Sequence, residues 1–239
     1  MCNKFGEVRS TAWIFPAPHI KTRPGASPQP SATRRSSASP KLAPHTMADF
    51  SRFSLADINI SAKGAKTAAL TCGGERFHYT TDLTRAPFGP GSFERDPAAT
   101  RQNLELRATS SMEEFFSSLD AWAIEYLTAH SQRLFKKPLT LAQVREMYHP
   151  TLRRAEGYTP LLRTKINMPP SRGAIKCWTA EGQPREAPKD WREAEVKARV
   201  HVSHVWFMGA ACGIVCNCTD LLVIESTGAF PFGAPELPA

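Results

Sequence analysis

The chain has 239 residues, of which 41% are apolar and 22% charged, a composition typical of a globular protein with a buried core. Its formal net charge is +8, but residues 1–46 contain seven Lys or Arg and a single Glu. The rest of the chain is therefore nearly balanced. This excludes a strongly basic surface over the whole folded part, and a nucleic-acid site there has to be a local patch.

Residues 1–46 are rich in Ser, Pro, Ala and Arg, which predicts a disordered basic leader. Two interpretations of it remain open: a transit peptide for a mitochondrion or plastid, or residues upstream of a true start at Met47. The six cysteines lack the spacing of a disulfide framework and no apolar signal peptide precedes them, so we expect an intracellular protein of the nucleus or an organelle. The longest apolar run, residues 205–216, is shorter than the roughly 20 residues of a membrane helix, and we expect no membrane partner.

Short alternating segments follow the leader. Residues 53–61, 67–72 and 76–83 predict a strand and then a hairpin, with Gly73 and Gly74 as its turn. Residues 85–91 contain prolines and glycines that break regular structure, and residues 103–108 predict a fourth strand.

Two helices are predicted next. Ser111 and Glu114 match a capping box, and apolar residues at helical spacing extend this long helix to about Arg133. Thr140 and Gln143 predict a second, short helix that ends near Tyr148, because the proline at position 150 disfavours helix at the residue before it. Strands are predicted again at residues 160–167 and 174–179.

The strongest strand pattern is the last hairpin. Residues 195–208 alternate, which predicts one face with Val196, Ala198, Val200, Val202, Trp206 and Met208 and the other with Lys197, Arg199, His201, Ser203 and Phe207. Residues 214–225 return with an apolar face of Ile214, Cys216, Cys218, Leu222 and Ile224. Together the elements predict one β-rich α+β domain over residues 47–225, with a long and a short helix inserted between strands, followed by a flexible tail at 226–239.

No catalytic motif is present. Residues 64–67 lack the earlier glycine and the following helix of a phosphate-binding loop, and we predict neither an enzyme nor a cofactor. Cys212, Cys216 and Cys218 do not match a common zinc-ligand spacing, so we interpret them as small buried apolar residues and predict no metal. His204 interrupts the apolar strand face and is interpreted as a core histidine hydrogen-bonded to a neighbour.

Cations and aromatic residues recur in two regions. Bases stack on rings while Lys and Arg follow phosphates, so these residues are candidates for binding a single strand. They are Arg153, Arg154, Tyr158, Arg163, Lys165, Lys176 and Trp178 in the first region and Lys197, Arg199 and Phe207 on the last hairpin. The alternative from the residues alone is an ordinary solvated sheet face, with Tyr158 or Trp178 in the core.

Four short motifs lie in order around these elements: Ala86-Pro87-Phe88-Gly89, Tyr148-His149-Pro150-Thr151, Tyr158-Thr159-Pro160, and Val205-Trp206-Phe207-Met208-Gly209 with Gly213. In these motifs the segment 53–224 resembles a family of single-stranded-DNA-binding-like proteins of large DNA viruses of algae and protists and of some of their hosts. The resemblance implies an elaborated OB-like barrel, or a curved antiparallel sheet with the same inserted helices.

The resemblance also implies non-catalytic, sequence-independent binding of single-stranded DNA, with RNA as the other ligand to consider. It leaves the oligomeric state open. Because the alternation places Trp206 inward, Phe207 is the expected stacking ring. Two alternatives are kept: a protein-interaction or structural module that uses the exposed C-terminal hairpin, and a small-molecule enzyme with a site that no motif reveals.

Overall fold

The computed structural model describes residues 49–92, 99–171, 173–188, 191 and 194–224. The predicted leader, residues 1–46, and the predicted tail, residues 226–239, lie outside the described residues. The fold is β-rich: the described strands form one sheet, and three α-helices are inserted in the chain between strands β6 and β7. This confirms the predicted α+β class, in the form of an open sheet.

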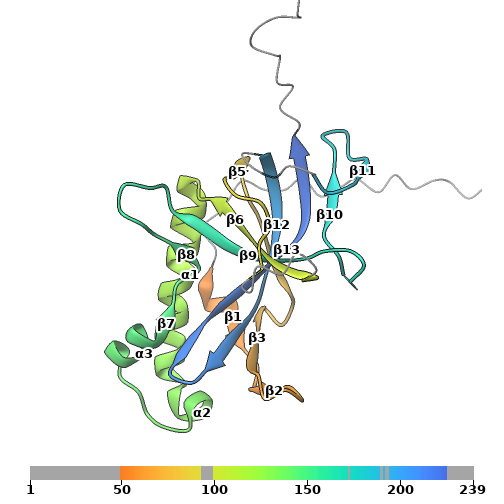
Figure 1. Cartoon of the computed structure of the whole chain (residues 1–239). Helices are drawn as coiled ribbons and strands as arrows, with labels where there is room; N and C mark the ends of the chain where they lie inside the picture. The colour runs from red at the N-terminus through yellow and green to blue at the C-terminus, as the bar shows by residue number, and fades with distance from the viewer. Residues whose placement is uncertain (1–48, 93–98, 172, 189–190, 192–193, 225–239) are drawn as a thin grey trace, which may run out of the picture. The chain divides into compact units, whose positions relative to one another are not determined.

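The long C-terminal hairpin is the centre of the sheet, as predicted (Figure 1). Its strands are β12 (Ala194–Met208) and β13 (Ala211–Ile224), which pair antiparallel along almost their whole length. The sheet runs in the order β1-β3-β12-β13-β10-β11, and further strands branch from this path. Two continuous strands of this length offer backbone groups to several shorter neighbours, so the hairpin organises the rest of the sheet.

The N-terminal strands pair along β12. β3 (Lys66–Cys72), β4 (Phe77–Thr80) and β5 (Thr84–Ala86) each pair antiparallel with it. β3 also holds the short strands β1 (Phe53–Leu55) and β2 (Asn59–Ile60). The predicted strand 53–61 is thus two separate strands, and β5 forms where prolines and glycines predicted irregular chain. A three-residue 3-10 helix, η1 (Phe50–Arg52), precedes β1.

The middle of the chain adds strands beside β13. β6 (Arg101–Arg107) pairs with β9 (Leu161–Asn167) over seven residues, and β9 also pairs with β8 (Leu152–Arg153). β13 pairs in parallel with β7 (Tyr148–His149), with β9 at one position, and with β10 (Lys176–Trp178). β11 (Pro184–Arg185) pairs with β10. The two-residue strands β7, β8 and β11 were not predicted, because so short a segment has no alternation to recognise.

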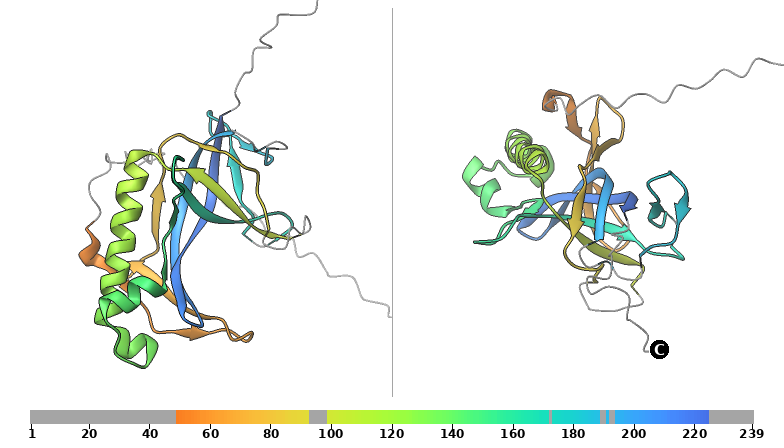
Figure 2. Two further views of the ribbon diagram at one scale, coloured as in Figure 1. Left: turned by 60° about the vertical axis from the view of Figure 1, so that its left-hand side comes forward. Right: turned by 90° about the horizontal axis from the view of Figure 1, so that it is seen from above.

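The helices lie together on one side of the sheet (Figures 1 and 2). They are α1 (Ser110–Ala129), α2 (Ser131–Phe135) and α3 (Leu141–Met147). The predicted cap of the long helix was wrong: the Thr109 hydroxyl accepts from the Met112 N–H, while the Ser111 hydroxyl donates to Asp82. The helix ends at Ala129 rather than near Arg133. The capping box of Thr140 and Gln143 on α3 is confirmed.

A buried carboxylate joins α1 to the strand that follows α3. Asp120 is 8% exposed, and it accepts hydrogen bonds from the Tyr148 hydroxyl at 2.7 Å and from the Thr151 N–H and hydroxyl at 3.0 Å each. Buried polar groups need such partners, because an unpaired one costs its full desolvation energy. The three bonds hold the segment from Tyr148 to Thr151 against the helix.

Two β-bulges change which side chains of the hairpin face the core. Ser203 is an extra residue of β12, since Val202 pairs with Cys216 and His204 with Val215. Thr219 is an extra residue of β13, between the pairs of Val200 with Cys218 and of Arg199 with Asp220. An extra residue on one strand reverses the alternation beyond it.

The predicted faces are therefore right on one side of each bulge and wrong on the other. Val196, Ala198, Val200 and Val202 are fully buried as predicted, but beyond Ser203 the buried residue is Val205. On β13, Cys216 and Cys218 are buried as predicted. Beyond Thr219 the buried residues are Leu221 and Val223 instead of Leu222 and Ile224. No helix of the described part is long and apolar enough to span a membrane.

Candidate nucleic-acid interface

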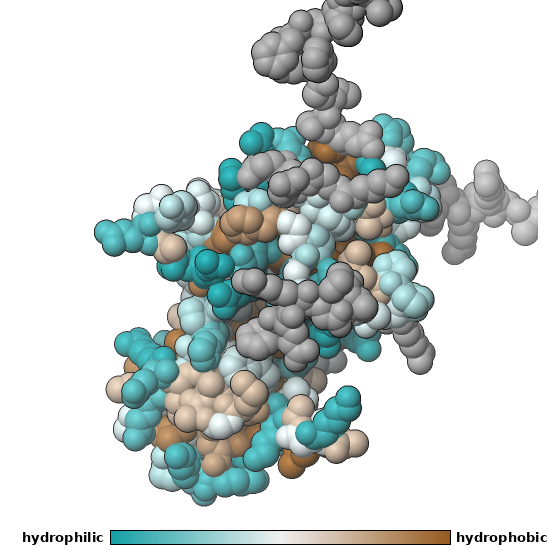
Figure 3. Space-filling view, viewed as in Figure 1, coloured by the Kyte–Doolittle hydropathy of each residue, from teal (hydrophilic) through white to brown (hydrophobic). Residues whose placement is uncertain are grey.

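A large open groove lies at the end of the sheet where the β12–β13 hairpin turns. Its volume is about 1670 Å³. Four regions of the chain supply most of its walls: the segment from Asp57 to Thr67, the end of α2, the strands β7 and β9, and the hairpin turn. Figure 3 shows an apolar, light-brown area low on this face, where the hairpin ends in Figure 1, and hydrophilic side chains border it. The groove thus combines an apolar surface with a polar rim.

Cations outnumber acids around this groove. Seven Lys or Arg line it against two acidic residues. The cations are Lys63, Lys66, Arg133, Lys136, Lys137, Arg163 and Lys165, and the acids are Asp57 and Glu105. The charge of the described residues is locally concentrated here, although the chain outside its first 46 residues is nearly balanced.

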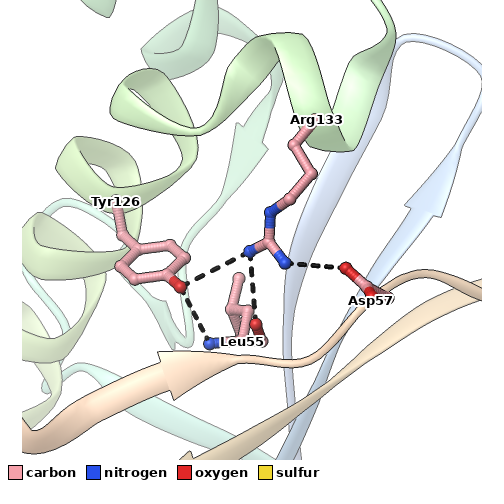
Figure 4. A network of polar contacts seen from close by, with 4 residues as sticks. All are labelled: Leu55, Asp57, Tyr126 and Arg133. Carbon is pink, nitrogen blue, oxygen red and sulfur yellow. Dashed lines mark hydrogen bonds and ion pairs between the residues drawn. The ribbon is translucent and has the colours of Figure 1, made fainter.

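Arg133 is held in place by a polar network (Figure 4). Its guanidinium forms an ion pair with Asp57 at 2.8 Å and donates to the Leu55 carbonyl at 3.3 Å and to the Tyr126 hydroxyl at 3.5 Å. The Tyr126 hydroxyl in turn accepts from the Leu55 N–H at 3.3 Å. This network ties the end of α2 to the segment after β1. Arg133 therefore acts mainly as a support of the groove wall.

Glu105 neutralises a second arginine of the groove. It forms ion pairs with Arg163 at 3.4 Å and with Arg153 at 3.3 Å, and its side chain is only 18% exposed. Lys165 stands two residues from Arg163 on β9, half-buried. Its pKa is lowered, first by desolvation and then by the charges of Arg101 and Arg163. A bound anion next to Lys165 would relieve this repulsion.

The remaining lysines of the groove are exposed and unneutralised. Lys63 and Lys66 lie at the turn between β2 and β3, and Lys136 and Lys137 follow α2. None of these four forms a salt bridge with another residue in the part of the chain that the structure describes. Lys136 ends α2 with φ 62°, the left-handed backbone that turns the chain. Flexible cations thus rise from two separate rims.

Two pairs of rings also line the groove. The centroid of Trp206 lies 5.6 Å from that of His149, and the centroid of Phe207 lies 5.4 Å from that of Phe135. Trp206 packs over Gly213, where an added Cβ would stand 3.1 Å from the Trp206 Nε1 and 2.8 Å from the His149 carbonyl oxygen. Only a residue without a side chain leaves room for the indole at this position.

The bulge at Ser203 corrects the predicted roles of Trp206 and Phe207. Phe207 has the same orientation as Val205 and packs partly against the core, while Trp206 lies with His204 on the opposite strand face. The prediction of an inward Trp206 is therefore wrong. His204 is half-buried and its Nδ1 lies 2.8 Å from the Ser203 hydroxyl. The predicted hydrogen bond to a neighbour is present, but His204 is not on the core face.

The structure brings three of the predicted site residues into the groove and places seven elsewhere. Arg163, Lys165 and Phe207 line the groove; Arg153, Arg154, Tyr158, Lys176, Trp178, Lys197 and Arg199 do not. Arg153 stands behind Glu105, Arg154 pairs with Glu113 of α1 at 3.2 Å, and Tyr158 is 79% exposed in the loop before β9. The indole N–H of Trp178 donates to Asp220 at 3.3 Å on the far part of the sheet. The sequence analysis therefore treated these ten residues as one site, whereas in the structure they lie in several separate groups.

Several groove residues had not been proposed as contacts. They are Lys63, Lys66, Lys136, Lys137, His149 and Trp206. His149 and Trp206 belong to the motifs that carry the family resemblance, which was the available signal for them. The lysines lie in turns with no periodic pattern, and only the pairing of β3 and β7 with the hairpin places those turns together.

The five described cysteines show no metal-site geometry. In the described residues there is no group of three or more His, Cys, Asp or Glu positioned to hold a metal ion. Cys212, Cys216 and Cys218 are buried, and burial raises the pKa of the Cys212 thiol to about 11 and those of Cys216 and Cys218 further. Thiols that stay protonated are poor nucleophiles and poor metal ligands.

No protein-family model and no curated protein matches the chain. Among solved structures it is similar to gp2.5, a single-stranded DNA binding protein encoded by bacteriophage T7, with 11% identity and a TM-score of 0.41 over 63% of this chain and 87% of that chain. It is also similar to the single-stranded DNA-binding protein from bacteriophage Enc34 in complex with ssDNA, with 11% identity and a TM-score of 0.39 over 73% and 98% of the two chains. Likenesses this weak do not assign a family, and the resemblance to proteins of large DNA viruses stays a prediction.

Proposed function

We propose that this protein binds single-stranded nucleic acid, in the first place DNA, in the groove at the end of the β12–β13 hairpin, without catalysis and without reading base sequence. One observation carries the proposal. The groove is lined by seven Lys or Arg against two acids, and the Trp206–His149 and Phe207–Phe135 ring pairs line it from opposite faces of β12. Cations that follow a backbone beside rings that stack on bases are the two requirements of single-strand binding.

The lysines of the two rims are suited to phosphates. Lys63 and Lys66 rise from one turn and Lys137 from the other side of the groove. A lysine ammonium is a compact charge on a flexible stem, which follows a phosphate without demanding one geometry. Arg133 and Arg163 already have carboxylate partners. We therefore assign the phosphate contacts to the lysines.

The rings are suited to bases. Trp206 is the better stacking platform, because Phe207 packs partly against the core. Every base has a π-face, so stacking on an indole does not depend on sequence. In a duplex the faces of the bases are already covered by their neighbours. The groove should therefore prefer single strands.

The test is fluorescence anisotropy of a labelled 12-residue oligothymidylate with the full chain over a range of salt concentrations. Five lysines of the groove form no salt bridge with another described residue, so the logarithm of the association constant should fall with the logarithm of salt by a slope of up to about 3.5, at about 0.7 per neutralised phosphate. Trp206→Ala should weaken binding about 10-fold to 100-fold at an unchanged slope, because stacking neutralises no phosphate. Trp206→Phe should keep part of the affinity.

A matched pair of variants separates the groove from general charge. Lys63→Gln with Lys137→Gln should lower the slope by about 1.4, whereas Arg52→Gln with Arg145→Gln removes the same charge outside the groove and should leave it unchanged. The leader is present in every variant, so its charge cancels in the comparison. Equal effects of the two pairs, or tighter binding of duplex than of single strand, would overturn the proposal.

A protein-interaction module remains the second candidate, because two apolar side chains on the groove rim are exposed. Met208 is 73% exposed at the hairpin turn and Ile60 is 60% exposed in β2. Exposed apolar patches mark protein contacts as well as ligand grooves. If the chain binds no oligonucleotide at low salt, this candidate takes the place of the first. Cross-linking through Met208→Cys would then identify the partner.

A further inference from the structure

The polar face of the hairpin continues beyond the groove as two rows of side chains across the sheet. Residues that are directly paired on neighbouring strands project to the same face. The first row contains His78 of β4, His201 of β12, Asn217 of β13 and Lys165 of β9. Lys165 also lines the groove, so this row begins inside the proposed binding site.

The second row lies two residues from the first toward the N-terminal end of β12, away from the groove. It contains Thr80 of β4, Arg199 of β12, Asp220 of β13 and Lys176 of β10. The Asp220 carboxylate accepts from the Thr219 hydroxyl at 2.8 Å and from the Trp178 indole at 3.3 Å. Arg199 and Lys176 are exposed, and neither forms a salt bridge with another described residue. The two donors to Asp220 are neutral and leave its negative charge in place, so the row has an excess of one positive charge.

The first row also contains a pair of stacked imidazole rings. The centroids of His78 and His201 are 5.0 Å apart and their planes differ by 26°. Desolvation lowers the pKa of both imidazoles, and the positive charge of Arg76 lowers them further. At neutral pH these planar rings are therefore uncharged. A base can stack on such rings, and because the rings are uncharged they neutralise no phosphate.

We propose that a single strand bound in the groove continues across these two rows, so that the binding site extends from Trp206 past Lys165 and His201 to Arg199 and Lys176. The inference rests on the proposed function of the groove. From Trp206 to Arg199 the strand β12 spans seven residues, about 23 Å at about 3.3 Å per residue. Oligonucleotides that fill only the groove should not reach the second row, and longer ones should.

The test compares a 4-residue and a 16-residue oligothymidylate, the two ends of the range of about 4 to 16 nucleotides seen for single-strand-binding domains. Arg199→Gln with Lys176→Gln should weaken the 16-mer at least 10-fold and lower its salt slope by about 1.4. The 4-mer should change less than twofold. His201→Ala should weaken the 16-mer without changing its slope, because the ring neutralises no phosphate.

The control is again Arg52→Gln with Arg145→Gln, which should affect neither length. If the two oligonucleotides respond equally to Arg199→Gln with Lys176→Gln, or if neither responds, the extended path is wrong while binding in the groove stands. If the unaltered chain binds neither length, the proposed function fails and the extension fails with it. Circular dichroism and urea denaturation of each variant show whether it is folded.

Discussion

The buried Asp120 should make the stability of this protein depend on pH. Its carboxylate accepts hydrogen bonds from Tyr148 and Thr151, yet burial raises its pKa to about 6, because desolvation disfavours the charged form more than the three bonds favour it. Asp120→Asn replaces the acid with a neutral group of the same shape. The carboxamide oxygen can still accept from Thr151, and its NH₂ can donate to the Tyr148 hydroxyl oxygen.

The expected magnitude follows from the difference between the two pKa values. The ordinary pKa is 3.8 and the folded value is about 6, so the shift is about two units, or about 3 kcal/mol at about 1.4 kcal/mol per unit. The folded state binds the proton more tightly than the unfolded state. The stabilising contribution of the protonated acid is therefore complete below about pH 3.8 and is lost as the pH rises through about 6.

The assay is urea denaturation of the full chain and of Asp120→Asn at several values between pH 4 and pH 8. The difference in free energy of unfolding should move by about 2.5 kcal/mol in favour of the variant across this range, while other titrating groups cancel. Asp120→Ala leaves the partners unpaired and should be less stable at every pH, by about 1–3 kcal/mol. A difference between Asp120→Asn and the unaltered chain that does not vary with pH would refute the argument.

Two further predictions concern local geometry. Gly213→Ala should destabilise the protein by about 1–3 kcal/mol in urea denaturation, since the added Cβ would stand 2.8 Å from the carbonyl oxygen of His149 and 3.1 Å from the Trp206 ring; an unchanged midpoint would show that the hairpin yields easily. Thr140→Ala should cost about 1 kcal/mol through the lost cap of α3 and leave oligonucleotide affinity unchanged. A change in affinity would mean that α3 takes part in binding.

Features that depend on near neighbours in the chain were predictable. The capping box of Thr140 and Gln143 and the turn at Gly73 and Gly74 are both present, and both glycines have positive φ. Each is a contact between residues a few positions apart, so its energy is encoded locally. The start of α1 was mispredicted because the Ser111 hydroxyl bonds to Asp82, a residue 29 positions away.

The alternation of β12 shows where local pattern fails. Ser203 reverses the faces of the strand, and its hydroxyl donates to the Val215 carbonyl at 3.1 Å and accepts from Asn217 at 2.9 Å. These partners lie on β13, so the residue pattern of β12 alone does not reveal them. An extra residue is visible only against the strand it pairs with. The stacking ring was assigned to Phe207 for this reason.

By itself, the sequence determined the β-rich class, the two helical regions with the cap of the second, the central hairpin and the kinds of residue from which a binding surface could be made. Tertiary structure alone decided which of them meet. The groove joins the lysines near residues 63–66, those after α2, His149 and Trp206, segments brought together by the pairing of β3 with β12 and of β7 with β13. Such contacts leave no local signature, because they depend on backbone pairing between distant strands and not on any residue's immediate neighbours.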